Sequence, residues 1–355
     1  SKADGGTFDG NVTMAGTLAV TGATTLTGGV SGNTTFSNNV TITGDLASST
    51  SGTSNFRAGV NAGNSIASGG NFNTVVGDEA GTALTTGDDN TAFGYGALYS
   101  EDAHGKNTAV GTNSLLTLNA GADGYNTAVG YFSGRLITTG IRNTLIGSSS
   151  GVSLTSGNYN TALGYIALDA DTQGQSSVAI GYGSLTSQNF TSATDAYNVA
   201  VGLNAGNQVT TGISNTIVGG LAGDALTDAD HNVAVGQSAL SADTKGSKNT
   251  AVGHSALEAQ NFTSSTSSYN TAIGSDAGKA ISTGIQNVII GSNAGDALTD
   301  ADFNVAIGYN VLSADTKGSR SVAIGRSALG SQNFSSATDT NNTAVGFGTG
   351  SSVTT

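Results

Sequence analysis

A short pattern of polar and apolar residues recurs along most of the chain. Its core is Asn, then Thr or Val, then Ala, then Val or Ile, and finally Gly, from residues 73–77 to residues 342–346. Motif glycines follow one another mostly at 17 residues, and Gly130, Gly202, Gly274 and Gly346 are each 72 residues apart. The chain therefore carries a 17-residue repeat nested within a 72-residue repeat.

Each repeat predicts one very short strand, because β-branched residues flank the central Ala and a turn-forming Gly follows. Such a strand cannot bury its own apolar face, whereas stacked neighbours can. We therefore predict an all-β fold, a parallel β-solenoid (a β-roll) of about 17 rungs, a rung being one repeat unit. At about 4.8 Å per rung the rod would be roughly 80 Å long.

The two β-branched positions lie two residues apart and share one face of the strand. We expect this face to point into the solenoid and the Ala between them to point outward. A continuous outward column of Ala would then be a packing seam, since an unbroken apolar stripe in water usually marks an interface. A homotrimer around the rod axis would bury it.

Two types of rung alternate in pairs. One has Gly four residues after the motif Gly and an apolar residue seven after it, and the other has Leu four residues after. This order reveals a divergent first rung at residues 55–59. The predicted domains are a tail (1–9), a shaft (10–46), a connection (47–54) and the solenoid (55–355), whose quartets of rungs are 55–125, 126–197, 198–269 and 270–341, with a partial rung at 342–355.

The shaft prediction comes from residues 10–46, where glycines six residues apart separate short segments of alternating apolar and polar residues. A single chain could enclose little core with such strands, so we expect three chains to wind together as a short intertwined triple β-helix. The Ser- and Thr-rich residues 47–54 would connect this shaft to the solenoid.

Asn at one corner of nearly every rung predicts a hydrogen-bonded ladder of side-chain amides, and the alternative is a simple turn preference for Asn. The following Gly would close the strand with a turn. The predicted structural ladder comprises Asn126, Asn143, Asn160, Asn198, Asn215, Asn232, Asn249, Asn270, Asn287, Asn304, Gly130, Gly147, Gly164, Gly202, Gly219, Gly236, Gly274, Gly291 and Gly308.

Composition narrows the function classes. The chain has 355 residues with 54 Gly, no Pro, no Cys and no Trp, and its net charge is −13. Absence of Cys excludes disulfides and thiolate metal sites. The acidic balance disfavours nucleic acid and anionic membranes as partners, and no apolar run is long enough for membrane insertion as a helix.

Aromatic residues are the candidates for surface binding. Exposed Tyr after the motif Gly could stack on sugar rings, or could pack against a neighbouring rung or chain. Three longer rungs carry matched Gln-Asn-Phe insertions that should line up on one side and either protrude for binding or fold back over an open edge. The candidates are Tyr131, Tyr165, Tyr182, Tyr309, Phe190, Phe262 and Phe334.

Repeated acidic residues raise the question of calcium. One acidic pair recurs after 72 residues, as Asp228 with Asp230 and as Asp300 with Asp302. A further acid recurs at the same interval, as Asp171, Asp243 and Asp315. Turn carboxylates can hold Ca²⁺, but no full ligand set is visible, and solvated turn residues are the preferred interpretation. The three His residues lie in unrelated registers and form no catalytic motif. We predict no cofactor, no metal site and no enzymatic activity.

Residues 177–181 and 321–325, each Ser-Val-Ala-Ile-Gly, resemble the head repeats of trimeric autotransporter adhesins. The form at 126–131, Asn-Thr-Ala-Val-Gly-Tyr, resembles repeats of marine-phage tail fibres, and residues 10–22 resemble phage-fibre shafts. The resemblance implies a left-handed trimeric β-roll and an extracellular fibre. The rungs are longer than the compact repeats of adhesin heads, and no coiled-coil stalk or anchor is recognisable, which favours the phage fibre.

We therefore expect a bacteriophage tail fibre, a virion component that binds a host glycan or protein receptor and other virion tail or fibre proteins. The alternative is a trimeric adhesin of a bacterial surface or an extracellular filament subunit. Less favoured are a tail spike that depolymerises glycans, for which catalytic acids should be singular, and an ice-binding solenoid using the Thr pairs at 138–139 and 210–211.

Overall fold

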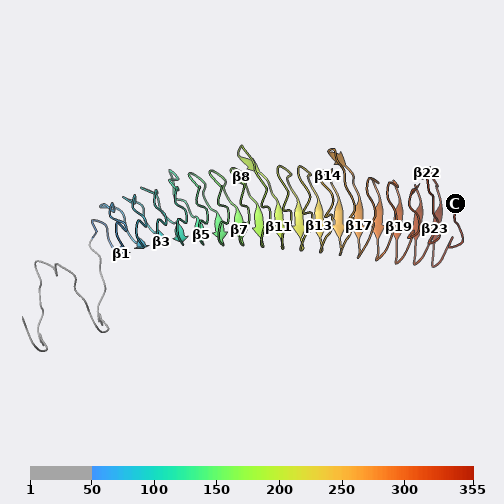
Figure 1. Cartoon of the computed structure of the whole chain (residues 1–355), viewed down its shortest axis with the longest axis horizontal. Coiled ribbons are helices and arrows are strands. Elements are labelled where there is room, and N and C mark those ends of the chain that lie inside the picture. The colour runs from blue at the N-terminus through green and yellow to red at the C-terminus, as the bar shows by residue number, and fades with distance from the viewer. Residues whose placement is uncertain (1–49) are drawn as a thin grey trace, which may run out of the picture. The chain divides into compact units, whose positions relative to one another are not determined.

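The structure, a computed structural model, describes residues 50–355, which contain strands and turns and no helix. These residues belong to one compact unit. The predicted tail and intertwined shaft lie outside the described residues. Within them, the rungs stack one behind another in chain order (Figure 1). The predicted all-β parallel solenoid is therefore confirmed.

One parallel sheet of 17 strands runs along the solenoid, and each rung supplies one three-residue strand. The strands are β1 (Phe56–Ala58), β2 (Thr74–Val76), β3 (Thr91–Phe93), β4 (Thr108–Val110), β5 (Thr127–Val129), β6 (Thr144–Ile146), β7 (Thr161–Leu163), β9 (Val178–Ile180), β11 (Val199–Val201), β12 (Thr216–Val218), β13 (Val233–Val235), β15 (Thr250–Val252), β17 (Thr271–Ile273), β18 (Val288–Ile290), β19 (Val305–Ile307), β21 (Val322–Ile324) and β23 (Thr343–Val345).

Equivalent repeat positions pair directly. Ala200 of β11 pairs with Ala179 of β9 on one side and with Ile217 of β12 on the other. The divergent first rung follows the same register, since Arg57 of β1 pairs with Val75 of β2. The sequence repeat is therefore also the structural repeat, including the rung that lacks the consensus motif.

The predicted orientation of the strands was wrong. The central residue of the strands after β1 is buried, as Ala200, Ala234 and Ile217 show, whereas the flanking β-branched residues are partly exposed. The Ala column therefore lines the interior and the Thr, Val and Ile columns face outward. The physical reason is room: the small Ala leaves space inside a narrow rung for the large side chains of the opposite wall.

Those large side chains enter from two places. In the Gly type of rung, the residue seven positions after the motif Gly is buried, as in Val209, Leu226 and Leu298. In the Leu type, the residue four positions after it is buried, as in Leu240 and Leu312. The second apolar position of each rung therefore packs against the central strand residues rather than against the β-branched face that we expected inside.

The choice between Gly and Leu follows from packing. A Cβ on Gly223 would lie 2.8 Å from Cδ1 of Leu226, inside van der Waals contact. The backbone is left-handed at this position in both rung types, with φ 48° at Gly223 and 55° at Leu240. Gly is therefore required where a neighbouring Leu already fills the space, and the conformation itself admits Leu.

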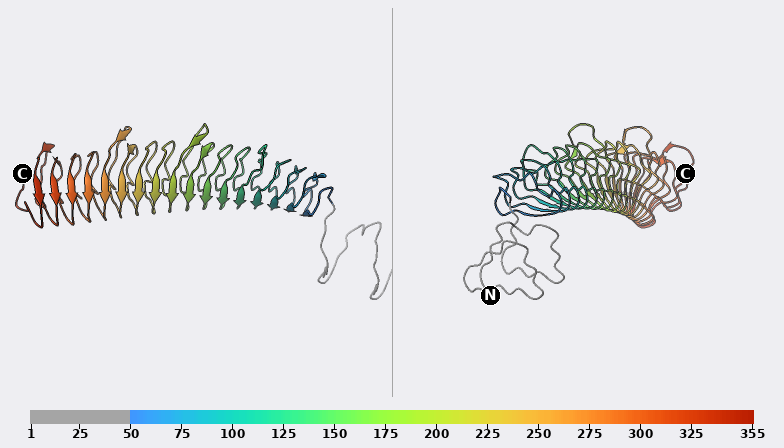
Figure 2. Two further views of the ribbon diagram at one scale, coloured as in Figure 1. Left: turned by 180° about the vertical axis from the view of Figure 1, so that it is seen from behind. Right: turned by 60° about the vertical axis from the view of Figure 1, so that its left-hand side comes forward.

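The three longest rungs place their insertions on the same side of the stack (Figures 1 and 2). Each insertion forms a two-stranded parallel sheet with the preceding rung. The pairs are β8 (Gly174–Gln175) with β10 (Thr194–Asp195), β14 (Gly246–Ser247) with β16 (Thr266–Ser267), and β20 (Gly318–Ser319) with β22 (Thr338–Asp339).

Replacing Gly223 by Leu should destabilise the solenoid by about 1–3 kcal/mol, because the new side chain overpacks the space of Leu226. Combining Gly223→Leu with Leu226→Ala should cost less than the sum of the two single changes, because the introduced side chain then fills the vacated volume. Chemical denaturation followed by circular dichroism measures both.

Gly220→Leu is the matched control, because a Cβ there meets no heavy atom within 4 Å. Its effect should stay within about 0.5 kcal/mol. Additive costs of the Gly223 and Leu226 changes would contradict the packing explanation.

Candidate functional site

The recurring Asn column forms a buried ladder along the interior corner of the solenoid. The Asn215 backbone N–H donates to Oδ1 of Asn198 at 3.0 Å, and Asn215 Nδ2 donates to the Ala229 carbonyl at 2.8 Å. The same backbone contact links Asn232 to Asn215 and Asn287 to Asn270. These side chains satisfy buried backbone groups at the turn, so their role is structural.

The motif glycines are held by the next rung. A Cβ on Gly219 would lie 2.5 Å from the carbonyl oxygen of Gly236, and φ at Gly219 is 139°. Only Gly fits such a conformation beside a backbone so close. The predicted ladder residues therefore lie together along one corner, but they offer no side chain to a ligand.

Ser replaces Asn in two rungs, and a Gln of the same rung completes the hydrogen bonding. Gln188 Nε2 donates to Oγ of Ser177 at 3.0 Å, while Gln188 Oε1 accepts from Nδ2 of Asn198 at 2.9 Å. Gln332 and Ser321 repeat the arrangement. The insertion thus supplies the amide that the shorter Ser cannot.

The repeated acids Asp171, Asp243 and Asp315 are buried, contrary to the solvated turn residues that we expected. Asp243 Oδ2 accepts from Gln260 Nε2 at 2.5 Å, and Asp243 Oδ1 accepts from the backbone N–H groups of Gly246 and Phe262. Burial raises the pKa of the Asp171 carboxyl, against the lowering effect of equivalent donors. Protein donors already occupy both oxygens, so these acids are structural.

The Phe residues of the insertions do not protrude together. Phe190 is 6% exposed and Phe262 is 8% exposed, and Phe334 is partly buried. Of the two alternatives, folding back over the preceding rung describes these Phe residues, whereas their binding role stays a prediction. The backbone N–H of each Phe donates to the buried Asp of that rung, which holds all three residues in place.

The acidic pairs on the turns are not gathered into a metal site. Asp230 Oδ1 accepts from the backbone N–H of Ile213 at 2.8 Å, and Asp228 lies 3.8 Å from Nζ of Lys245. Asp300 has the same relation to Lys317. Calcium binding by these residues stays untested, but their oxygens serve the turn and a neighbouring lysine.

In the part of the chain that the structure describes, one group has ligand atoms within 4.8 Å of one another, namely Glu101, Asp102 and His104. Glu101 takes the repeat position of Asp171 in the first quartet and is buried. It accepts from the backbone N–H groups of His104 and Ala120, and burial raises the pKa of its carboxyl. This group too has a structural explanation.

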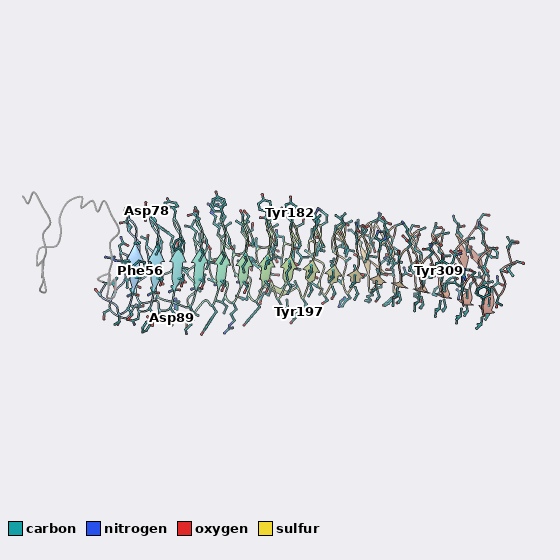
Figure 3. All side chains as sticks on the ribbon, turned by 90° about the horizontal axis from the view of Figure 1, so that it is seen from below. Phe56, Asp78, Asp89, Tyr182, Tyr197 and Tyr309 are labelled. Atoms are coloured by element: carbon teal, nitrogen blue, oxygen red, sulfur yellow. The ribbon has the colours of Figure 1, made fainter. Side chains whose placement is uncertain are left out.

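Exposed aromatic residues border the sheet on both sides. Figure 3 shows Tyr182 on one side of the strands and Tyr197 on the other. The predicted residues Tyr131, Tyr165, Tyr182 and Tyr309 are all about half exposed. Their exposure is therefore confirmed, whereas their binding role stays a prediction.

Most of these rings contact a neighbouring side chain. Tyr131 stacks on Phe132 with ring centroids 3.8 Å apart, and the rings of Tyr165 and Tyr182 are 5.7 Å apart. A cationic side chain contacts another of these rings, since the guanidinium of Arg326 lies 5.7 Å from the Tyr309 ring centroid. Neighbouring rungs therefore use much of this aromatic surface themselves.

The outward face of the long sheet is uncharged. The first and third residues of its 17 strands are Thr, Val, Ile, Leu or Phe, with one Ala at the end of β1. Several are well exposed, including Phe93, Leu163 and Val345. Exposed uncharged stripes with apolar side chains are typical of association surfaces in other proteins.

Two of the hollows in the described surface lie among the turns. One, of about 560 Å³, is lined by Tyr95, Tyr99, Glu79 and Asn113 among others. The other, of about 610 Å³, is lined by Asp224, Glu258, Lys279 and Asp296 among others. Lys279 pairs with Glu258 at 3.4 Å, so charges within the second hollow neutralise one another in part. The first hollow has aromatic walls, and sequence reasoning missed Tyr99 because its repeat position carries no aromatic residue elsewhere in the solenoid.

Comparisons of the chain with models of known protein families, with curated proteins and with solved structures found no match. Within residues 50–355 the structure has no helix with the length and apolar character needed to cross a membrane. Function must therefore be argued from the surfaces described above.

Asp243→Asn should lower the free energy of unfolding by about 1–3 kcal/mol, although the substitution is isosteric. The new Nδ2 would face Nε2 of Gln260 or a backbone N–H, so a buried donor loses its acceptor. Asp228→Asn is the control, because its exposed partner at 3.8 Å contributes about 0–1 kcal/mol. Equal effects in thermal or chemical denaturation would contradict a structural role for the buried pair.

Glu101 should make stability depend on pH. Its pKa is raised in the folded state, so the folded chain holds its proton more tightly than the unfolded chain. This contribution is fully present below the unfolded pKa and is lost as the pH rises through the folded pKa. The unfolding free energy of the wild type minus that of Glu101→Gln should therefore fall from about pH 4 to pH 7, measured by denaturation at each pH. A difference that rises with pH would refute it.

Proposed function

We propose that the chain is a structural and adhesive fibre segment that works as a homotrimer of parallel solenoids. The observation that carries the proposal is the uncharged outward face of the 17-stranded sheet. It runs along every rung, and burying it removes apolar area from water at about 25 cal/mol per Å². The seam is thus formed by the Thr, Val and Ile columns and not by Ala.

The geometry of a repeat favours cyclic association. Each chain presents the same face at every rung, so parallel neighbours in register would repeat one contact along the whole rod. Three faces turned toward a common axis close the assembly and leave no apolar stripe in water. The left-handed winding and the intertwined shaft at residues 10–46 belong to the same proposal.

The proposed role is a bacteriophage tail fibre, extracellular and attached to other virion tail or fibre proteins, that binds a host glycan or protein receptor. Support comes from the resemblance of the Asn-Thr-Ala-Val-Gly repeats to those of phage fibres. The mechanism is mechanical: a stiff rod holds binding sites away from the virion, and three copies strengthen weak contacts by multivalency. A bacterial surface adhesin or filament subunit is the alternative location for the same mechanism.

We propose no enzymatic activity. The acids that glycan cleavage would need recur with the repeat, and Asp228 and Asp300 each lie 3.8 Å from a lysine Nζ. Buried Asp243 and its equivalents are saturated with protein donors. These partners support a structural use for the carboxylates.

Sedimentation equilibrium of the purified chain should give three times the chain mass of 34.7 kDa. Val235→Lys with Ile307→Lys places two charges on the outward face and should shift the mass toward the monomer, because an unpaired charge is costly to bury. Gln208→Lys, on an exposed turn away from the strands, should leave the trimer intact. A wild-type chain that stays monomeric at high concentration would defeat the proposal.

A further inference from the structure

The hollow beside β3 differs from the rest of the surface because it breaks the repeat. Tyr95 follows the motif glycine Gly94, and Tyr99 stands five residues after that glycine. In the other described rungs the position of Tyr99 carries no aromatic residue. The other rungs stack without an aromatic residue at this position, so stacking alone does not explain Tyr99.

Residues from three successive rungs line this hollow of about 560 Å³. Tyr95, Tyr99 and Ser100 come from one rung, Glu79 comes from the preceding rung, and Asn113, Leu116 and Thr117 come from the next. All of them belong to the turns and bends between strands, so none lies on the outward face of the sheet. Association through that face would therefore use other residues.

Both Tyr rings are available. Tyr95 is 57% exposed and Tyr99 is 41% exposed. Among the described residues, neither ring has an aromatic or cationic neighbour of the kind that Tyr131, Tyr182 and Tyr309 have. Their hydroxyl groups have no hydrogen-bond partner within the described residues either, so the rings could receive a ligand without losing a protein contact.

Polar groups line the hollow together with the two rings. Asn113 offers an amide, Ser100 and Thr117 offer hydroxyls, and Glu79 offers a carboxylate. Glu79 Oε1 already accepts from Nδ2 of Asn61 at 2.9 Å, which holds the carboxylate in place while leaving lone pairs free. The single negative charge disfavours anionic ligands.

The rung of Tyr182 provides a natural comparison. There too a Gly follows the Tyr, and a Cβ on Gly183 would lie 2.4 Å from Oδ1 of Asn204, as one on Gly96 would from Oδ1 of Asn113. The position of Tyr99 is taken by Thr186. The position of Glu79 is taken by Ile166, so the second Tyr and the carboxylate both distinguish the hollow from the site of Tyr182.

We propose that this hollow binds the ring of a neutral pyranose sugar at the end or within a glycan. The apolar C–H face of the sugar would stack on Tyr95 or Tyr99, and its hydroxyls would bond to Asn113, Ser100 and Glu79. A few polar groups on an aromatic-walled hollow match a ligand with one apolar face and a polar rim. This inference rests on the proposed adhesive function and locates one glycan contact within it.

Saturation-transfer NMR of the full chain with lactose, maltose, cellobiose and chitobiose tests the site. At least one disaccharide should receive saturation, and Tyr99→Ala should weaken its apparent Kd roughly tenfold, because a stacking contact is lost. Tyr182→Ala is the matched control and should leave the affinity unchanged. Circular dichroism and sedimentation of each variant confirm that it folds like the wild type.

The outcomes separate the two proposals. A trimer without transfer to any of the four sugars, or with transfer that Tyr99→Ala leaves unchanged, overturns the sugar site and leaves the fibre proposal standing. A monomeric wild-type chain defeats the trimeric fibre, whatever the sugars show. Loss of binding in Tyr99→Ala but not in Tyr182→Ala supports the assignment to this hollow.

Discussion

The structure depends on the registered stacking of parallel rungs, one strand spacing apart. A three-residue strand cannot satisfy its own backbone, so each rung must bond to the rung before and the rung after it. The Asn ladder extends this constraint to the corner, where Asn215 bonds to Asn198 and Asn232 bonds to Asn215. Gly219 obeys it as well, because the backbone of the next rung occupies the place of a Cβ.

The same constraint explains why the polar interior is so regular. Asp243 and Gln260 lie in neighbouring rungs at the repeat position that carries an apolar residue in the Gly type of rung, and each bonds to the other. A buried carboxylate is tolerated because three donors converge on it. Acids that recur with the repeat can thus indicate a hydrogen-bonded pair that recurs in every such rung. A residue that departs from the repeat is the better candidate for a function. Tyr99 is such an exception.

The outside of the solenoid is free of the stacking constraint and divides into surfaces of different character. The outward strand positions are uniformly uncharged, which the proposed association along the rod requires. The bordering turns vary from rung to rung, and Arg326, Tyr131 and Phe132 make local contacts there. The proposed association surface and the proposed binding site can therefore coexist on a rod whose interior stays the same.

The repeat in the sequence was enough to predict the parallel solenoid, its 17 rungs, the divergent rung at residues 55–59 and the Asn ladder, because all of these follow from spacing along the chain. Which face of the strand is buried depended on volume across the rung: Val and Ala are both apolar, and alternation defines two faces without saying which one is inside. Two of the partners of Asp171 likewise lie in the neighbouring rung, 17 residues away at Gln188 and 19 residues away at Phe190. Only the stacked structure brings those groups together, since burial and hydrogen bonding are properties of contacts between rungs.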